Sequence, residues 1–516
     1  MNIINALQNS SLYDHPVSGF EVIETHISWV LLTGDYAYKI KKPVNFGFLD
    51  FSTIEQRKFY CEEEVRLNSR LARGLYLGVV SINGSETHPE INGQGPVIEY
   101  AVKMRQFPQQ MQLDRLLKET GLDNDIMDKL AMTVAHFHLS IERASRDNTF
   151  GDFDHVQQPV LENFSQIKAN VKDNNILPLL NKLEAWTQKK LEQLENNIEQ
   201  RRLNGFVREC HGDMHLRNIA LWDDELIIFD CIEFNRNLYW IDVISEIAFL
   251  VMDLEDRQQD ALARRFLNSY LEITGDYEGL KLLRFYKVYR ALVRAKVDAL
   301  RVAQEQVGSS DYVATFNDFL QYLHLAEIYI CPLEPCLLIN HGVSGSGKSY
   351  GTRLLLESFP AIQVRSDVER KRMFSAAVTD NVSGFEQSIY TPEATRKTYL
   401  RLVEIAKTLL TAGYTVVIDA ANLKQEQRQL FIELASLMRI PYYILSYSAP
   451  EKILRDRLVQ RSQSGHDVSD ATVEILQQQL LHQEPLTPDE RLFTIDVDTS
   501  KEINIDAMVE LILAGK

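Results

Sequence analysis

No stretch of the sequence is long and apolar enough to cross a membrane. Of its 516 residues, 45% are hydrophobic and 25% are charged, which is ordinary for a soluble globular protein. A membrane span needs roughly 18 consecutive apolar residues, and the initial MNIINALQNSSLYD lacks the basic start and apolar core of a signal peptide. We therefore expect a cytoplasmic protein with a sizeable buried core and no membrane partner.

An excess of basic residues is also lacking. The chain has 55 Lys and Arg against 72 Asp and Glu, for a formal net charge of −17. Binding to a polyanion rests on Lys and Arg that neutralise its phosphates. The charge balance argues against nucleic acid as a partner and leaves open only a local basic groove, and nothing in the composition indicates an oligomeric state.

Cysteine is sparse and has no metal-binding spacing. Cys331 and Cys336 have four residues between them, but no second pair completes a zinc site. An odd number of scattered cysteines predicts buried or inert thiols. The five are Cys61, Cys210, Cys231, Cys331 and Cys336.

Internal repeats and low-complexity linkers are absent from the sequence. The chain is about three times the usual domain length of roughly 150 residues, so we expect more than one domain. A β-rich stretch comes first, interrupted by one helix whose start carries a capping box, Ser52 followed by Glu55. Long helical patterns follow, and then strands and helices alternate, which predicts βαβ units around a parallel sheet. The expected domains are 1–331, with a small β-rich lobe about 20–106 and a helical lobe about 107–330, and 332–516.

One short motif groups two polar side chains that phosphoryl transfer needs. In HGDMHLRN, four residues separate Asp213 from Asn218, so one tight loop can aim Asp213 at an acceptor hydroxyl and turn Asn218 toward a metal. Downstream, ELIIFDCIEF predicts a buried strand that ends at Asp230, where a carboxylate can hold Mg²⁺ against phosphates. A lone HGD is most often a turn, and Asp230 alone could cap a helix, but their order along the chain favours catalysis.

The segment YAYK places Ala37 and Lys39 on one side of a predicted strand, because strand side chains alternate. A small residue can lie under a nucleotide base while the lysine reaches its phosphates. Such a lysine needs a carboxylate to position it, and the helical pattern that follows offers Glu62, Glu63 and Glu64. We expect one of the three to face inward.

Residues 20–330 resemble the aminoglycoside phosphotransferase group of small-molecule kinases, which are distant relatives of protein kinases. The resemblance rests on HGDMHLRN, IIFD, YAYK and CEEEVRLNSRL. It implies a bilobal protein-kinase-like fold that uses ATP and Mg²⁺. The roles it implies are Asp213 as catalytic base, Asn218 and Asp230 as Mg²⁺ ligands, Lys39 with its partner Glu64 on the phosphates, and Met104 in the hinge strand YAVKMRQF against the adenine.

The sequence departs from that group in two places. No Gly-rich loop separates ETHIS from WVLL, so how the phosphates are covered stays open, and Cys231 follows Asp230 where a protein kinase has Phe. His136 and His138 are interpreted as helix-packing or lobe-contact residues rather than as ligands. Asp242 is interpreted as a structural support that holds the catalytic loop from the following helix.

A second phosphate-binding motif lies in the last third of the chain. LLINHGVSGSGKSYGTRLLL is an apolar strand, a GxxxxGKS loop and a helical pattern in that order, the context that a Walker A motif requires. The glycines let backbone N–H groups and a helix N-terminus meet the charge of phosphates, Lys348 adds a mobile positive charge, and Ser349 offers a hydroxyl to Mg²⁺. The expected nucleotide-binding residues are Gly342, Ser344, Gly345, Ser346, Gly347, Lys348 and Ser349.

Further polar residues of this half complete a candidate second site. RSDVER offers Asp367 as a base beside Arg370 as a clamp on a substrate phosphate, although the neighbouring basic residues are barely distinguished from Arg370. VVIDAANL ends a predicted strand at Asp419, a Walker B-like Mg²⁺ partner or a residue that holds a water. Arg457 and Arg461, about one helical turn apart, can close on the phosphates from a lid, or they form a solvated basic face.

Residues from about 333 to 516 resemble the P-loop kinases grouped with zeta toxins, polynucleotide kinase and gluconate kinase. The matching segments are GVSGSGKS, RSDVER, VVIDAANL and the two lid arginines. The whole chain resembles a bacterial family in which an aminoglycoside phosphotransferase-like kinase is fused to a P-loop domain. The resemblance implies a three-layer α/β/α P-loop fold with ATP, or alternatively GTP, and Mg²⁺ as cofactors.

We expect a bifunctional ATP-dependent phosphotransferase that acts on hydroxyl groups of small molecules. One alternative is a regulatory protein in which one domain only binds nucleotide and controls the other; another is a toxin-like kinase of a sugar nucleotide. Base and metal residues in both halves favour the first hypothesis, because a domain that only binds nucleotide needs neither Asp213 nor Asp367. Antibiotic resistance is discounted, since nothing in the chain identifies an aminoglycoside pocket.

Overall fold

The computed structural model describes residues 3–47, 49–171, 173–375, 391–464 and 472–515. The chain divides into two compact units. The first, the N-terminal unit, comprises Met1–Arg257 and Phe285–Ala326; the second, the P-loop unit, comprises Gln258–Arg284 and Glu327–Lys516. A single cut at residue 331/332 therefore does not describe this division, because a segment from the helical region packs with the P-loop half.

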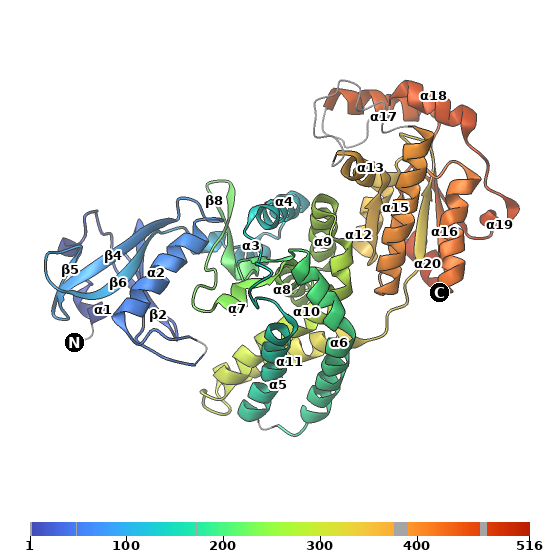
Figure 1. Ribbon diagram of the computed structural model, residues 1–516. Coiled ribbons are helices and arrows are strands. Elements are labelled where there is room, and N and C mark those ends of the chain that lie inside the picture. The colour runs from blue at the N-terminus through green and yellow to red at the C-terminus, as the bar shows by residue number, and fades with distance from the viewer. Residues whose placement is uncertain (1–2, 48, 172, 376–390, 465–471, 516) are drawn as a thin grey trace. The chain divides into compact units, whose positions relative to one another are not determined.

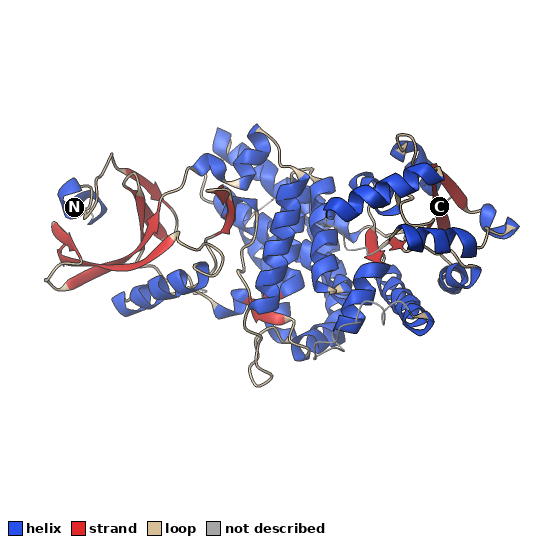
Figure 2. Ribbon diagram, turned by 90° about the horizontal axis from the view of Figure 1, so that it is seen from above, coloured by secondary structure: helices blue, strands red, loops and turns tan. Residues whose placement is uncertain are grey.

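An antiparallel sheet forms the first lobe of the N-terminal unit (Figure 2). Its strand order is β1-β2-β3-β6-β4-β5, and the helix α2 follows β3 in the chain. The elements are β1 Glu21–Glu24, β2 Ser28–Leu32, β3 Tyr36–Lys41, α2 Ile54–Asn68, β4 Tyr76–Ser85, β5 His88–Ile91 and β6 Val97–Arg105. The β-rich lobe with one helix is confirmed.

The capping box of α2 lies one residue later than expected. Thr53, not Ser52, is the N-cap: its hydroxyl accepts a hydrogen bond from the backbone N–H of Gln56, whose side chain accepts one from the Thr53 N–H. The sequence holds two overlapping boxes, Ser52 with Glu55 and Thr53 with Gln56, and both fit the pattern equally well. The tertiary fold selects the second.

Helices make up the second lobe of the N-terminal unit (Figure 1). α8 is its central helix, since 12 of its 14 residues are buried. Two two-stranded antiparallel sheets, β7 with β10 and the hairpin of β8 with β9, flank the HGDMHLRN segment. The main elements are α4 Asn124–Ser140, α5 Phe153–Asn170, α6 Leu177–Leu203, β7 Val207–Glu209, β8 Ile219–Trp222, β9 Glu225–Ile228, β10 Trp240–Asp242, α8 Val243–Asp256, α10 Leu280–Val302 and α11 Ser310–Ile330.

A parallel sheet forms the centre of the P-loop unit, as the alternating pattern predicted. Its order is β12-β13-β11-β14-β15, with α12 and α20 packed against one face and α15 and α16 against the other (Figure 1). The strands are β11 Leu337–His341, β12 Ile362–Arg365, β13 Val416–Asp419, β14 Tyr442–Ser448 and β15 Thr494–Asp498. The helices are α12 Lys348–Ser358, α13 Ser366–Ser375, α15 Pro392–Thr411, α16 Gln425–Met438, α17 Glu451–Ser464, α18 Val473–His482 and α20 Ile505–Ala514.

The helix α9, Asp260–Thr274, belongs to the P-loop unit although it lies far from the P-loop in sequence. The guanidinium of Arg264 donates hydrogen bonds to the carbonyls of Leu356 and Glu357 near the end of α12. Asn268 pairs with the edge strand β12, accepting from the Gln363 N–H at 2.8 Å and donating to the Ala361 carbonyl at 3.2 Å. α9 therefore covers a sheet edge whose backbone groups would otherwise lack partners.

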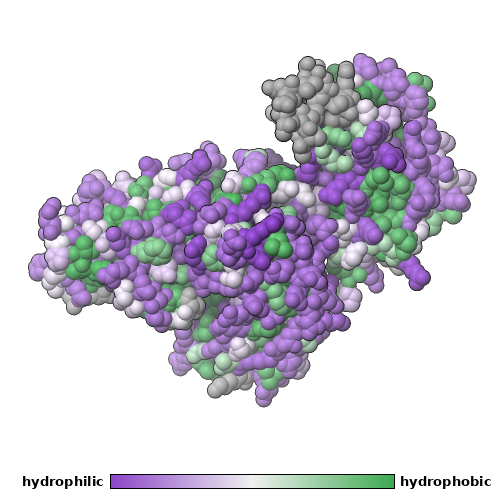
Figure 3. All heavy atoms as spheres, viewed as in Figure 1, coloured by the Kyte–Doolittle hydropathy of each residue, from purple (hydrophilic) through white to green (hydrophobic). Residues whose placement is uncertain are grey.

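Hydrophobic residues meet solvent only in small groups on the face shown in Figure 3, scattered among hydrophilic side chains. Among the helices that the structure describes, none combines the length and the hydropathy that a membrane crossing requires.

Candidate active sites

Three segments far apart in sequence meet at Lys39 in the N-terminal unit. The ammonium nitrogen of Lys39, on β3, lies 2.8 Å from Glu64 Oε1 on α2 and 2.8 Å from Asp230 Oδ1, just after β9. Glu64 is completely buried. Burial acts to raise the pKa of Glu64, but the charges of Lys39 and Lys41 outweigh it and lower that pKa to about 2. Of the three glutamates considered, Glu64 is therefore the one that holds the lysine.

A second buried ion pair, which sequence reasoning missed, extends this cluster. Lys41 Nζ lies 2.7 Å from Glu64 Oε2 and also contacts the carboxylate of Glu233. Burial raises the pKa of Glu233, and the charge of Lys41 opposes that shift. The period of β3 could have indicated Lys41, because residues 37, 39 and 41 share one side of a strand, but nothing local indicates Glu233.

The catalytic-loop candidates lie together in the HGDMHLRN turn. The side-chain amide of Asn218 donates to the Asp213 backbone carbonyl at 3.0 Å and to Asp213 Oδ2 at 3.1 Å. His215 Nε2 lies 3.3 Å from the same carboxylate oxygen. Burial acts to raise the pKa of Asp213, but His215 and His211 outweigh it and hold the pKa below its usual range. Asp213 is thus an ionised acceptor of hydrogen bonds at neutral pH.

Glu246 holds this loop from α8. Its carboxylate accepts hydrogen bonds from the backbone N–H groups of His211 at 2.7 Å and Gly212 at 2.6 Å, and it lies 2.8 Å from His138 Nε2. Arg290 adds a hydrogen bond to the Gly212 carbonyl at 3.2 Å. His138 is buried, and its imidazole contacts the carboxylate that holds the loop.

Asp242 does not have the supporting role that its position suggested. Its carboxylate pairs with Arg201, at 2.6 and 2.8 Å, and caps α8 by accepting from the Ile244 N–H at 2.8 Å. Asp242 lies at the start of α8, and Glu246 one turn later reaches the loop instead. The sequence offered two acidic residues at helical spacing, and only the packing of α8 shows which one faces the loop.

A cleft of about 950 Å³ joins these residues in the N-terminal unit. Its lining includes Lys39, Met104, Asp213 and Asp230, whereas Glu64 lies buried behind Lys39. The turn between β1 and β2 also lines the cleft, with Thr25 and Ser28. Their hydroxyl oxygens lie 2.9 Å apart, and Thr25 Oγ1 accepts from the Ser28 N–H. This hydroxyl-bearing turn occupies the place where the sequence shows no Gly-rich loop.

In the P-loop unit, the phosphate-binding motif forms a tight loop between β11 and α12. Lys348 Nζ donates to the carbonyls of Gly342 at 2.8 Å and Val343 at 2.9 Å. Gly342 has φ +147°, and a Cβ there would lie 2.5 Å from the Tyr447 carbonyl oxygen, so a larger residue does not fit.

The end of the loop leads into α12. Gly347, in the left-handed region, caps the start of this helix. Gly345, Ser344 and Ser349 line the adjacent cavity, whereas Ser346 is buried within the loop.

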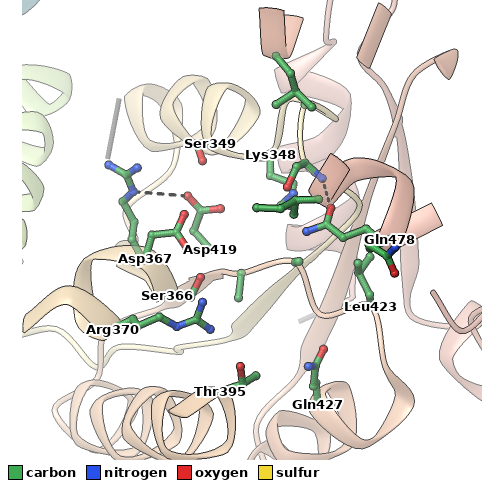
Figure 4. Close-up of a pocket in the computed structure, with 18 of the residues that line it drawn as sticks. Lys348, Ser349, Ser366, Asp367, Arg370, Thr395, Asp419, Leu423, Gln427 and Gln478 are labelled. Carbon is green, nitrogen blue, oxygen red and sulfur yellow. Dashed lines mark hydrogen bonds and ion pairs between the residues drawn. The ribbon is translucent and has the colours of Figure 1, made fainter. Parts of the chain in front are cut away.

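Two aspartates approach Ser349 across this cavity of about 700 Å³ (Figure 4). Asp419, at the end of β13, accepts hydrogen bonds from Asn340 at 3.1 Å and Gln363 at 2.8 Å. Asp367 lies on the first turn of α13, and Arg370, nearly buried, lines the same cavity. The structure thus brings together the candidate base, clamp and metal residues of the second half.

Arg457 contacts the loop itself. Its guanidinium donates to the Gly345 carbonyl at 3.1 Å and to the Thr499 hydroxyl and carbonyl at 2.8 and 2.6 Å. These contacts tie the P-loop to the segment after β15, which differs from the expectation of a free lid arginine. Arg461 lies on the same helix, α17, but its side chain is outside the described residues.

Residues of α18 border the P-loop cavity, and sequence reasoning missed them. Gln479 Oε1 accepts a hydrogen bond from the Ser344 N–H at 2.7 Å. Gln478 and His482 line the cavity beside it. No motif marks this helix, since glutamine in a helical pattern is ordinary surface composition.

Both sites offer oxygen ligands that suit Mg²⁺, a hard cation. In the N-terminal unit these are Asn218 and Asp230, and in the P-loop unit Ser349 and Asp419. Each of the two clefts is lined by a lysine, an acidic group and hard oxygen ligands. One cleft lies on a bilobal fold and the other on a parallel P-loop sheet, and together they define a two-domain kinase.

Comparison with known proteins agrees with this class. Residues 99–283 match the phosphotransferase enzyme family, and residues 337–486 match an AAA domain family. Uncharacterized proteins of Mycobacterium tuberculosis (strain H37Rv) and Mycobacterium bovis are 30% identical over 465 residues, covering 89% of this chain and 90% of theirs. The chain belongs with them to one family, and in this chain the phosphotransferase domain precedes the P-loop domain.

Solved structures align with part of the chain. A gluconokinase from Sinorhizobium meliloti shares 21% identity over 36% of this chain and 92% of its own, with a TM-score of 0.25. A choline/ethanolamine kinase family protein from Mesorhizobium loti shares 10% identity over 63% of this chain and 99% of its own, with a TM-score of 0.35.

Proposed function

We propose that the protein is an ATP-dependent phosphotransferase with two nucleotide sites, each of which transfers the γ-phosphate of ATP to a hydroxyl group of a small molecule. The observation that supports it best is the convergence of Lys39, Asp213 and Asp230 on one cleft, with Asn218 hydrogen-bonded to Asp213. These four side chains come from three separate segments, so their meeting is not a consequence of one local motif.

In the N-terminal site, Lys39 would bind phosphate oxygens while Glu64 keeps its ammonium group in place. Asp213 would orient the acceptor hydroxyl and take its proton as the bond to phosphorus forms. Met104 and Ala37 would lie against the adenine, and the Thr25 turn would cover the phosphates from above. Mg²⁺, when held by Asn218 and Asp230, would neutralise phosphate charge.

In the P-loop site, backbone N–H groups of the loop and Lys348 would bind the phosphates, and Asp367 would act as the base. Arg370 would clamp the acceptor, and Arg457 would position the loop through Gly345. Ser349 and Asp419 would hold Mg²⁺.

One contact favours a second candidate function. Gln479 occupies the Ser344 N–H, a group that a phosphate would use. A P-loop unit that is closed by α18 until nucleotide displaces Gln479 would serve as a nucleotide sensor that controls the N-terminal site.

The deciding experiment compares wild-type protein with Asp213→Ala and Lys348→Ala in a bacterial metabolite extract supplied with ATP and Mg²⁺. Mass spectrometry detects compounds that gain one phosphate. Two independent kinases predict that each variant loses a different product. If Lys348→Ala changes only the rate at which the Asp213-dependent product forms, the sensor function replaces the bifunctional one. If neither variant loses a product, both proposals are wrong.

A further inference from the structure

Two helices line the part of the N-terminal cleft beyond the phosphoryl-transfer residues. α5 contributes Gln158, Glu162 and Gln166, which follow one another at intervals of four residues and so share one helix face. α10 contributes Val293, Lys296 and Val297, again on one face. A molecule that presents a hydroxyl to Asp213 would lie between these two faces, because they and Asp213 line the same cleft.

The described residues that line the cleft outside the Lys39 and Asp213 cluster do not carry the negative charge that a polycationic ligand would need. Beyond the cluster around Lys39 and Asp213, Glu162 is the one carboxylate in the lining that the structure describes, against Lys296 and Arg105. Glu162 already accepts a hydrogen bond from the side chain of Gln166 at 2.5 Å. A ligand with several ammonium groups would need several carboxylates, so the chain's overall net charge of −17 does not describe this surface.

Lys296 differs from its neighbours on α10. Lys287 lies 2.8 Å from Glu255, and Arg290 bonds to the Ser245 and Gly212 carbonyls. Lys296 is partly buried and has no hydrogen bond or ion pair with any described residue. Burial lowers its pKa, and the charge of Glu162 offsets only part of that effect. A partly buried ammonium group that lines a cleft and forms no ion pair with a described residue can bind an anion.

We propose that the acceptor of the N-terminal site is an anionic hydroxylated small molecule, whose carboxylate or phosphate group is bound by Lys296 while its hydroxyl faces Asp213. This inference rests on the proposed function of that site. Gln158 and Gln166 would bind further hydroxyls of the acceptor, and Val293 and Val297 would contact its carbon skeleton. The geometry also disfavours polycationic acceptors such as aminoglycosides.

The test uses the full-length protein and does not require the acceptor to be known. A bacterial metabolite extract is freed of nucleotides with charcoal and separated by ion exchange into anionic, neutral and cationic fractions. Each fraction receives γ-labelled ATP and Mg²⁺ with wild-type protein or Asp213→Ala. Label that enters small molecules only when Asp213 is present reports the N-terminal site.

The expected result is Asp213-dependent label in the anionic fraction. Phosphatase treatment of that fraction before the reaction distinguishes the two anions, because it removes a phosphorylated acceptor and leaves a carboxylate. Asp213-dependent label confined to the neutral or cationic fraction would overturn the inference but leave the proposed function standing. If no fraction takes up such label, the proposed function fails and the inference falls with it.

Variants then test Lys296 itself. Lys296→Gln removes the charge but keeps a polar, unbranched side chain that is one bond shorter, and it should raise the KM for the anionic acceptor about 10- to 100-fold, the loss expected for a charge-assisted hydrogen bond. The KM for ATP should stay the same, and Lys296→Arg should restore much of the acceptor affinity. Lys129→Gln, on the exposed side of α4, is the matched control. An unchanged acceptor KM in Lys296→Gln would contradict the role of Lys296.

Discussion

The two candidate sites of this protein hold the lysines that we propose to bind phosphate in opposite ways. Lys348 belongs to a contiguous loop and bonds to carbonyls five and six residues away. Lys39 is held by Glu64 and Asp230, and Asp230 lies 191 residues further along the chain. The P-loop site is therefore a local structure that one segment can form. The N-terminal site exists only after both lobes have folded around buried charges.

The largest expected effect separates chemistry from binding in the N-terminal site. Asp213→Ala should lower turnover of the Asp213-dependent product about 10²- to 10⁴-fold, because it removes a general base. Affinity for ATP should change little, since Asp213 would contact the acceptor rather than the nucleotide. Initial rates and calorimetric titration measure the two quantities, with Glu192→Ala on exposed α6 as the control. A variant with normal turnover would refute the role of Asp213.

Lys41→Met should show that the N-terminal cluster depends on tertiary structure. It leaves Glu64 and Glu233 buried with one cation fewer, and breaking a buried pair costs about 3–5 kcal/mol of unfolding free energy. Denaturant unfolding measures this loss. Lys58→Met, which removes an exposed lysine from α2, is the control and should have little effect. If Lys41→Met is as stable as wild type, Lys41 does not compensate these carboxylates.

Lys348→Ala should weaken one nucleotide site and leave the fold intact, because the printed bonds of this ammonium group go to two backbone carbonyls of its own loop. Loss of the charge-assisted bonds to phosphate should weaken binding about 10²- to 10³-fold. Calorimetry with a non-hydrolysable ATP analogue should then count one bound nucleotide per chain instead of two. Two retained sites of unchanged affinity would mean that the loop does not bind nucleotide.

The smallest effect tests whether α9 is part of the P-loop unit. Asn268→Ala leaves the Gln363 N–H and the Ala361 carbonyl on the edge of the sheet without their partner, at a cost of about 1–3 kcal/mol. Hydrogen exchange at the Gln363 amide should accelerate, whereas Lys407→Ala on α15 should leave it unchanged. Equal protection in both variants would show that α9 does not support β12.

The same contacts predict that a fragment starting at residue 333 is less stable than one that includes α9.

Much of each site could be predicted because its signals are local. Asp213 and Asn218 share one turn, and the P-loop residues share another, so their spacing alone indicated that they act together. The supporting residues carried no such signal. Glu246 rather than Asp242 holds the catalytic loop, Glu233 joins the buried lysines, and Gln479 meets the P-loop. Each is an ordinary residue for its element and gains its role only from a distant neighbour.

The sequence by itself determined the order of the elements, the parallel sheet of the second half and the two short motifs, because hydrophobic periodicity and turn chemistry act within a few residues. Only the tertiary structure decided which of three glutamates holds Lys39, which capping box starts α2, and that α9 completes the P-loop unit. Those choices depend on which side chains are buried together. The free energy of a buried charge or of an unpaired backbone group is set by its surroundings, which the spacing of residues along a chain does not contain.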